Sequence, residues 1–298
     1  RRGRDGQPRV TGPSGGDSPP ATPRAEPAGP PVPPLPQPLR VAVSGARGRV
    51  GREIVAALEA DPGFACAAAV DAGDDLAAAL AGAGAHVLVD FSVPTAALGN
   101  ALTAVAQGAR PVVGTTGLGG AAVGELRGRC AAAGLGGCVI PNFALGAALM
   151  MRLAEVCAGH FESCEIIESH HPGKLDAPSG TALRTAERLL AARRGRPFEH
   201  PDPHTETLPG TRGGELGGAG VHSLRLQGPV ADQSVIFGAP GQTLTLEHRT
   251  TSRAAFAPGV LAAARVVTAT ERFYTSLEEL LGLPPAAALG RAMASSET

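Results

Sequence analysis

Features that mark several classes of protein are absent from this sequence of 298 residues. No cluster of Lys and Arg follows the amino-terminal segment and the formal net charge is −1, whereas a nucleic-acid binder needs a basic face to replace phosphate counterions. No apolar run approaches the ~20 residues that span a bilayer. The five cysteines form no CxxC pair, which argues against a metal or a disulfide framework. We therefore expect a soluble cytoplasmic protein without nucleic acid, membrane or metal among its partners.

Core-forming residues are almost missing from the first 38 residues. Residues 1–40 contain twelve of the 27 prolines and six of the 41 glycines, and such a segment buries too little apolar surface to offset its ordering entropy. It also lacks the apolar stretch of a secretory signal. We predict a disordered extension over 1–38, either a tail or an over-extended reading frame rather than an organelle transit peptide.

From Leu39 onward the chain has the pattern of a folded protein, and its first part alternates strands with helices. Short apolar segments such as "LRVAVSG", "HVLVDFSVP" and "ARPVVGTTG" each end in turn residues, with Ala-rich helical stretches between them. This alternation predicts a parallel sheet joined by right-handed crossovers. We expect an α/β domain over 39–142.

The following elements are of mixed kind. The segment "ALGAALMMRLAEVCAGHF" has helical periodicity, "SCEIIES" alternates as a strand does, and "QSVIFGAPGQTLTLEHRT" resembles two strands joined by a glycine turn. We predict a smaller mixed α+β domain over 143–253. Residues 254–298, with the helical stretch "RAAFAPGVLAAARVVTATERF", are expected to return and complete the first domain.

The turn after the first strand, "SGARGRVG", places Gly45, Gly48 and Gly51 between a strand and a helix. Glycines let the backbone approach a pyrophosphate, and the helix N-terminus offers free N–H groups and a positive dipole end. The spacing differs from G-x-G-x-x-G, so a purely structural turn is the alternative. Asp71 ends the next strand twenty residues after Gly51, where an acid accepts hydrogen bonds from the adenosine ribose. This context favours a Rossmann-type dinucleotide site.

Two arginines inside this turn bear on the choice of cofactor. Arg47 and Arg49 are either solvated surface charges or a clamp for phosphate, including the 2′-phosphate of NADPH. Asp71 favours NADH instead. The sequence therefore allows NADH or NADPH.

Two further turns follow strands of the predicted sheet. The segments "VGTTG" and "IPNF" cover residues 113–117 and 140–143, and both face the carboxyl edge at which open α/β sheets bind ligands. Their hydroxyl and amide groups suit the nicotinamide ribose and carboxamide, although a tight turn alone would also explain either segment.

The segment "ESHHPGKLDAPSGTAL", residues 168–183, gathers hydrogen-bond donors ahead of a helix. His170 and His171 are adjacent at a strand end and should point to opposite sides. His170 suits proton transfer at neutral pH because an unperturbed imidazole has a pKa of about 6.5. We therefore predict that His170 is a proton donor.

The helix that follows is a candidate carboxylate site. Ser179 suits its N-cap position, which leaves the N–H groups of Gly180 and Thr181 near the positive end of the helix. A carboxylate could dock there, held by these donors, the Thr181 hydroxyl and Lys174.

Other interpretations of this segment are weaker. A metal bound by His170, His171 and Asp176 lacks further ligands at suitable spacing, and Ser179 lacks the G-x-S-x-G surroundings of a nucleophile. Surface histidines are the usual alternative, but here the donors cluster before a helix. We predict a site that binds and protonates a dicarboxylate while a bound dinucleotide delivers a hydride.

The same segment resembles the E-x-H-H-x-x-K-x-D-A-P-S-G-T-A signature of the 4-hydroxy-tetrahydrodipicolinate reductase family, and most closely that of its actinobacterial branch. The segments "GARGRVG", "DF", "VVGTTG" and "PNFALG" match the family's cofactor segments in the expected order. The resemblance runs from about Leu39 to near Leu283. It implies NADH- or NADPH-dependent reduction of 4-hydroxy-tetrahydrodipicolinate, via dihydrodipicolinate, to tetrahydrodipicolinate in lysine and diaminopimelate biosynthesis. It also implies a homotetramer associated through the sheets of the substrate domain.

The resemblance assigns roles to individual residues. It implies that His170 and Lys174 are the catalytic proton donors and that the substrate carboxylates are bound by His171, Gly180 and Thr181. Cofactor contacts are implied at Gly45, Ala46, Arg47, Gly48, Arg49, Val50, Asp71, Gly114, Thr115, Thr116, Ile140, Pro141, Asn142 and Phe143. Asp232 stands where the family pattern has His, and we attach no function to this difference.

Two other functions remain as alternatives. Another two-domain NAD(P)-dependent dehydrogenase of amino-acid metabolism would need a different catalytic constellation. A non-enzymatic dinucleotide sensor would keep the glycine turn and transfer no hydride.

Overall fold

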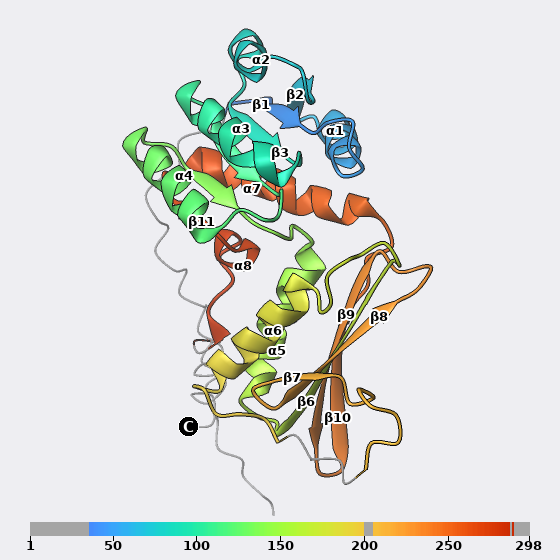
Figure 1. Ribbon diagram of the computed structural model, residues 1–298. Coiled ribbons are helices and arrows are strands. Elements are labelled where there is room, and N and C mark those ends of the chain that lie inside the picture. Colours follow the sequence, from blue (N-terminus) through green and yellow to red (C-terminus); the bar gives the residue numbers. More distant parts are fainter. Residues whose placement is uncertain (1–35, 200–204, 287, 289–298) are drawn as a thin grey trace, which may run out of the picture. The chain divides into compact units, whose positions relative to one another are not determined.

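Six parallel strands form the first sheet, in the order β11-β5-β4-β3-β1-β2 (Figure 1). Their bounds are β1 (Leu39–Ser44), β2 (Phe64–Val70), β3 (Val87–Asp90), β4 (Arg110–Val113), β5 (Gly137–Val139) and β11 (Phe273–Tyr274). The central strands β1 and β3 are buried except at Arg40 near the start of β1, as expected for parallel strands covered on both faces. The computed structural model describes residues 36–199, 205–286 and 288, so most of the predicted extension over 1–38 lies outside the described residues.

Helices cover both faces of this sheet. One face packs against α1 (Gly51–Ala60) and α7 (Ala257–Ala269), and the other against α2 (Leu76–Ala83), α3 (Pro94–Ala106) and α4 (Gly120–Ala132). After the 3₁₀ turn η1 (Arg253–Phe256), the chain thus returns to the first sheet with α7, β11 and α8 (Leu277–Leu280). We call this sheet and its helices the first lobe. It confirms the predicted α/β class.

The second sheet is mixed and has the order β10-β9-β6-β8-β7 (Figure 1). Its strands are β6 (Ser163–His170), β7 (Gly214–Leu216), β8 (Ala219–Arg225), β9 (Ala231–Ala239) and β10 (Gln242–His248). The central strand β6 runs parallel to β8 and antiparallel to β9. Helices α5 (Leu145–Ala158) and α6 (Gly180–Ala192) cover one face, and we call this assembly the second lobe.

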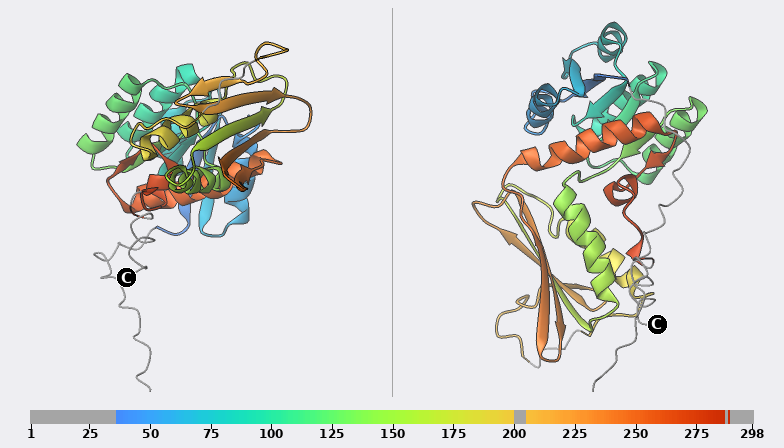
Figure 2. Two further views of the ribbon diagram at one scale, coloured as in Figure 1. Left: turned by 90° about the horizontal axis from the view of Figure 1, so that it is seen from below. Right: turned by 180° about the vertical axis from the view of Figure 1, so that it is seen from behind.

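Burial along β6 alternates as expected for a sheet with one covered face. Cys164, Ile166 and Glu168 point towards the helices and are buried, whereas Glu165 and Ile167 on the other face are partly exposed. Among the residues that the structure describes, no helix covers that second face (Figures 1 and 2). Glu168 is therefore a carboxylate buried between the sheet and its helices, where a charge requires hydrogen-bonding partners.

A buried guanidinium closes the far end of the second lobe. Arg193 is 5% exposed, and its guanidinium carbon Cζ lies 4.3 Å from the centre of the Phe198 ring. It donates hydrogen bonds to the carboxylate of Glu162 and to the carbonyls of Ala158, Phe161, Arg196 and Pro197. Arg193 therefore satisfies carbonyls that would otherwise lack partners at the end of α5 and after α6.

Buried ion pairs join α5, α6 and α8. Arg188 on α6 donates to Glu155 on α5 and, at 2.5 Å, to Glu278 on α8. Glu155 and Glu278 are 8% and 2% exposed, and Arg152 also donates to Glu155. This network attaches the chain's return segment to the second lobe.

None of the helices in the described ranges has the length and apolar character needed to span a membrane.

Candidate active site

The glycine turn after β1 has a geometry that only glycine permits at two positions. Gly45 has φ +76°, and a Cβ there would lie 2.5 Å from the carbonyl oxygen of Phe91. A Cβ on Gly51 would lie 2.0 Å from the carbonyl oxygen of Gly45. Helix α1 begins at Gly51 without a side-chain cap from Val50. The turn therefore presents its backbone and the positive end of α1 to a ligand, which suits a pyrophosphate.

Asp71 faces the same turn from the end of β2. Its carboxylate accepts the Arg47 N–H at 2.8 Å and lies 3.5 Å from the Arg47 side chain, which also pairs with Asp74 at 3.5 Å. The acid is thus oriented towards the glycine turn, at the position where ribose hydroxyls bind in dinucleotide sites. The Arg47 side chain is 75% exposed. Its guanidinium can therefore turn away from Asp71 to bind an anionic group of a ligand.

A buried carboxylate organises the ends of β3 and β4. Asp90 is fully buried and accepts hydrogen bonds from Ser92, Asn100 and Thr115, the last at 2.6 Å. Gly114 makes room for the Phe91 ring, since a Cβ at Gly114 would lie 2.3 Å from it. Thr115 is therefore held by Asp90, and Thr116 reaches the cavity described below. The sequence placed Asp90 only within a segment that resembles a cofactor segment of the family, and it gave Asn100 no role.

The "IPNF" segment also has a defined geometry. Ile140 donates its N–H to Val113, and the Asn142 side chain accepts the N–H of Ala144 at 2.9 Å. Phe143 is 1% exposed and packs against the Phe91 ring in a T-shaped arrangement, with ring centres 6.0 Å apart. Phe143 therefore packs in the core, whereas residues 140–142 face the cavity.

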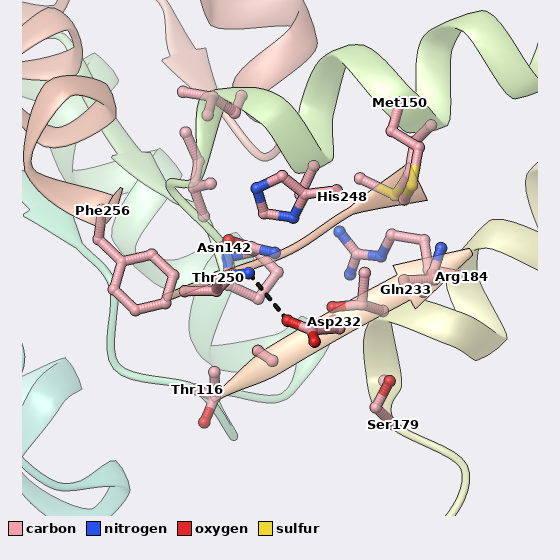
Figure 3. Close-up of a pocket in the computed structure, with 18 of the residues that line it drawn as sticks. Thr116, Asn142, Met150, Ser179, Arg184, Asp232, Gln233, His248, Thr250 and Phe256 are labelled. Carbon is pink, nitrogen blue, oxygen red and sulfur yellow. Dashed lines mark hydrogen bonds between the residues drawn. The ribbon is translucent and has the colours of Figure 1, made fainter. Parts of the chain in front are cut away.

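A cavity of about 530 Å³ brings residues of both lobes together (Figure 3). Eight of the predicted site residues line it: Thr116, Ile140, Pro141, Asn142, His170, Lys174, Gly180 and Thr181. The predicted residues that do not line it are Gly45, Ala46, Arg47, Gly48, Arg49, Val50, Asp71, Gly114, Thr115, Phe143 and His171. An elongated ligand on the glycine turn could extend along the strand ends so that only its far end entered the cavity. Arg49 instead lines a second cavity of about 390 Å³ with Arg52 and Arg253.

His170 ends β6 and is bound to Glu168. The His170 Nδ1 atom lies 2.5 Å from a Glu168 carboxylate oxygen, and their side chains are 14% and 0% exposed. Burial lowers the pKa of His170 below its usual range, and the positive charges of Lys174 and Arg225 act in the same direction. The Glu168 carboxylate opposes them and raises the pKa of His170. The second imidazole, His171, follows the strand end and does not line the cavity.

Lys174 places an ammonium group in the same cavity. Its Nζ atom lies 2.8 Å and 2.9 Å from the two carboxylate oxygens of Asp176, whose side chain is 60% exposed. The hydrogen bond from Lys174 lowers the pKa of Asp176. Because this partner is exposed, a substrate carboxylate can share or replace it at little cost.

The predicted N-cap of α6 is confirmed. The Ser179 hydroxyl accepts the N–H of Ala182 at 3.2 Å, and α6 begins at Gly180. The N–H groups of Gly180 and Thr181 are left at the positive end of the helix, beside Lys174 in the cavity wall. These groups can bind a carboxylate.

Sequence reasoning missed part of the cavity wall. Asp232 on β9 and His248 on β10 project into it (Figure 3), and Asp232 accepts the N–H of Thr250 at 2.9 Å. Burial lowers the pKa of His248, against the charge of Asp232, which raises it. Arg184 and Arg188 of α6 contribute further positive charge. The register of β9 against β6 places Asp232 here, and no local pattern reveals that register.

Two buried cysteines have thiols of raised pKa. Burial raises the pKa of Cys130 to about 11 and that of Cys164 to about 12, so both thiols are protonated and poorly nucleophilic at neutral pH. Within residues 36–199 and 205–286, no three His, Cys, Asp or Glu side chains are grouped as ligands of a metal ion.

Three features of the site indicate the class of protein. They are the glycine turn, the acid at the end of β2, and the cavity with its imidazole and ammonium groups. These are the features of a two-lobed oxidoreductase that binds a dinucleotide along the first lobe and its substrate on the second. Family models described as "Dihydrodipicolinate reductase, N-terminus" and "Dihydrodipicolinate reductase, C-terminus" match residues 39–143 and 146–281. The chain belongs to the dihydrodipicolinate reductase family.

Individual relatives agree with this family. The 4-hydroxy-tetrahydrodipicolinate reductase of Moorella thermoacetica is 48% identical over 263 residues, covering 82% of this chain and 98% of the relative. That of Mycolicibacterium smegmatis, an actinobacterium, is 44% identical over 246 residues, covering 82% and 100%. A dipicolinate-bound dihydrodipicolinate reductase from Paenisporosarcina sp. TG-14 has a TM-score of 0.74 and 33% identity, covering 81% of this chain and 98% of that one. The predicted family is thereby confirmed.

Proposed function

We propose that this chain reduces 4-hydroxy-tetrahydrodipicolinate, via dihydrodipicolinate, to tetrahydrodipicolinate in lysine and diaminopimelate biosynthesis. It is an oxidoreductase of its family, and its relatives carry this activity in their names. The observation that carries the proposal is the cavity in which His170, Lys174 and the start of α6 meet Thr116 and the 140–142 segment.

The cavity suits a planar diacid. One carboxylate is bound by Lys174 and by the N–H groups of Gly180 and Thr181, which offer positive charge and aligned donors. His171 is proposed to complete the binding of the carboxylates when the lobes close around the ligand. The relative from Paenisporosarcina holds dipicolinate, a flat diacid, which supports this choice of substrate.

The cofactor supplies a hydride when bound, and the chain supplies orientation and a proton. Residues of the glycine turn, Asp71, the 114–116 segment and the 140–143 segment are proposed to hold NADH or NADPH, as the family pattern implies. Donors on α6 and Lys174 fix the substrate so that its electrophilic carbon faces the first lobe. His170 or Lys174 then protonates the carbon or enamine centre at which negative charge develops.

Two further properties belong to this proposal. We propose a homotetramer that associates through the open face of the second sheet, because Leu224 of β8 lies on that face and is 47% exposed, and Leu226 directly after the strand is 46% exposed. Light scattering after gel filtration tests this, and a monomer at micromolar concentration would contradict it. We also propose a reducing cytoplasmic location, which fits five cysteines that are all free thiols.

The function is tested by a coupled assay. A dihydrodipicolinate synthase supplies the substrate, and the loss of NADH or NADPH absorbance reports reduction. We expect turnover with the wild-type chain and a loss of about 10²-fold or more in His170→Ala, with cofactor affinity unchanged. Cofactor binding without any turnover would instead favour a dinucleotide sensor, and turnover only with another substrate would favour a different dehydrogenase.

A further inference from the structure

Glu168 accepts four hydrogen bonds that reach it from three parts of the second lobe. One carboxylate oxygen receives the Ser179 N–H at 3.1 Å and an Arg225 N–H at 2.8 Å. The other oxygen lies 2.5 Å from the His170 Nδ1 atom and receives a second Arg225 N–H at 2.9 Å. The side chain is fully buried, so every acceptor direction of the carboxylate is used within the protein.

These contacts fix the imidazole as well as the carboxylate. An ionised carboxylate only accepts hydrogen bonds, so the His170 Nδ1 atom must carry the hydrogen between them. The proton that His170 exchanges with a ligand is then confined to Nε2, the nitrogen directed away from Glu168. The Ser179 N–H on the same carboxylate sets the start of α6 relative to the imidazole. One anion therefore sets the positions of a proton donor and a carboxylate-binding helix end.

We infer that Glu168 is a positioning residue: it holds His170 as the Nδ1–H tautomer with Nε2 facing the substrate, and Arg225 keeps it ionised. This inference rests on the proposed function and adds a residue to it. In the step concerned, the Nε2 proton of the imidazolium passes to the substrate carbon, and the imidazole is left neutral with its Nδ1–H still bonded to Glu168. Solvent restores the Nε2 proton after product release.

Of the charges around His170, that of Glu168 favours the protonated imidazole. Burial by itself would raise the pKa of Glu168, but hydrogen bonds from Arg225 and His170 bring it below its usual range. The charged groups that face the imidazole are Glu168 on β6, Lys174 in the following loop and Arg225 on β8. Asp176 pairs with Lys174, and Asp232 on β9 lines the same cavity. Glu168 is thus the one carboxylate within the described residues that touches the imidazole.

The matched control is a second carboxylate of the same strand. Glu165 lies 2.8 Å from His222 Nε2 and 3.3 Å from Arg212, so it too sits between an imidazole and a guanidinium. It points to the open face of the sheet and does not line the cavity. Glu165→Gln therefore changes the same chemical group in a similar setting without reaching His170.

The experiment compares Glu168→Gln with Glu165→Gln in steady-state kinetics across pH. An amide can donate to Nδ1 and favour the wrong tautomer, so we expect kcat of Glu168→Gln to fall about 10²-fold or more. The KM of the substrate and the Kd of NADH should change less than about threefold. Because His170 acts as an acid, activity is lost as pH rises through its pKa, and removing the adjacent anion lowers that pKa. The alkaline limb of kcat should therefore move down by about one pH unit or more, while Glu165→Gln keeps the wild-type profile.

Other outcomes decide against the inference. An unchanged kcat in Glu168→Gln overturns it, and so does a lower kcat with an unmoved alkaline limb, which indicates only structural damage. In the His170→Ala background, Glu168→Gln should cause no further loss, and an additive loss would also contradict it. If Glu168→Gln does not fold, nitrogen-15 NMR of wild-type His170 decides: the Nε2–H tautomer overturns the inference. An inactive wild-type chain would defeat the proposed function instead, and the tautomer measurement would still stand.

Discussion

The two lobes form their parts of the site in different ways. Around the glycine turn the first lobe uses backbone geometry, and its charged side chains there, such as Arg47 and Asp71, make exposed pairs. The second lobe instead uses buried charge, with Glu168 inaccessible to solvent between Arg225 and His170. The part of the site on the first lobe should therefore lose its function when a methyl group is added to a glycine. The part on the second lobe should lose its function when a charge is removed or neutralised.

The largest expected effect is on the backbone-built half. In Gly51→Ala, the new Cβ would lie 2.0 Å from the Gly45 carbonyl oxygen, so the turn must open and its N–H groups lose their alignment. We expect the Kd of NADH, measured by fluorescence titration, to rise about 100-fold or more. Gly124→Ala, on α4 with nothing within 4 Å of its added Cβ, should bind NADH as the wild type does. Equal affinities in the two variants would contradict the comparison.

Buried charge should also dominate the stability of the second lobe. Arg193→Met removes the donor for several carbonyls, so we expect the free energy of unfolding in urea to fall by about 3–5 kcal/mol. Arg196 is the matched control, since its side chain is 56% exposed and pairs with Glu162 at 3.2 Å. Arg196→Met should cost less than about 1 kcal/mol. Similar losses in both variants would show that burial is not the cause.

Acidification should weaken the charge-built half selectively. The folded-state pKa of Glu168 is lowered by its hydrogen bonds despite its burial. Its contribution to stability is therefore complete above the unfolded-state pKa, about 4.3, and is lost as pH falls through the lower folded-state pKa. Each unit of difference is worth about 1.4 kcal/mol. Urea titrations from pH 6 to pH 3 should show a steeper loss in wild type than in Glu168→Gln, and parallel curves would refute this.

The smallest effect is expected far from either half. Gly124 is exposed within α4 and has open space around it. Alanine there reduces the conformational freedom of the unfolded chain and favours the helix, so Gly124→Ala should raise the free energy of unfolding by about 0.5–1 kcal/mol. Thermal melts would show the change as a higher Tm with unaltered kcat.

The sequence predicted what short-range patterns encode. Strand–turn–helix signals located β1 and the glycine turn, and the Ser179 cap was predicted because an N-cap is a local feature. Arg225 was missed because it lies 57 residues from Glu168 and meets it only through the register of β8 on β6. Arg188 and Glu278 are 90 residues apart in sequence. The two-residue strand β11 is too short to give a periodic signal.

The late return of the chain to the first sheet has a consequence for synthesis on the ribosome. Strand β5 gains its outer neighbour, β11, only from residues 273–274, and α7, with Val260 and Val267, completes the cover of the apolar face on which α1 already packs. A nascent polypeptide therefore keeps an unpaired sheet edge and an uncovered apolar surface until residues 257–274 have been translated. Chaperones that recognise such surfaces should be needed most before those residues leave the ribosome.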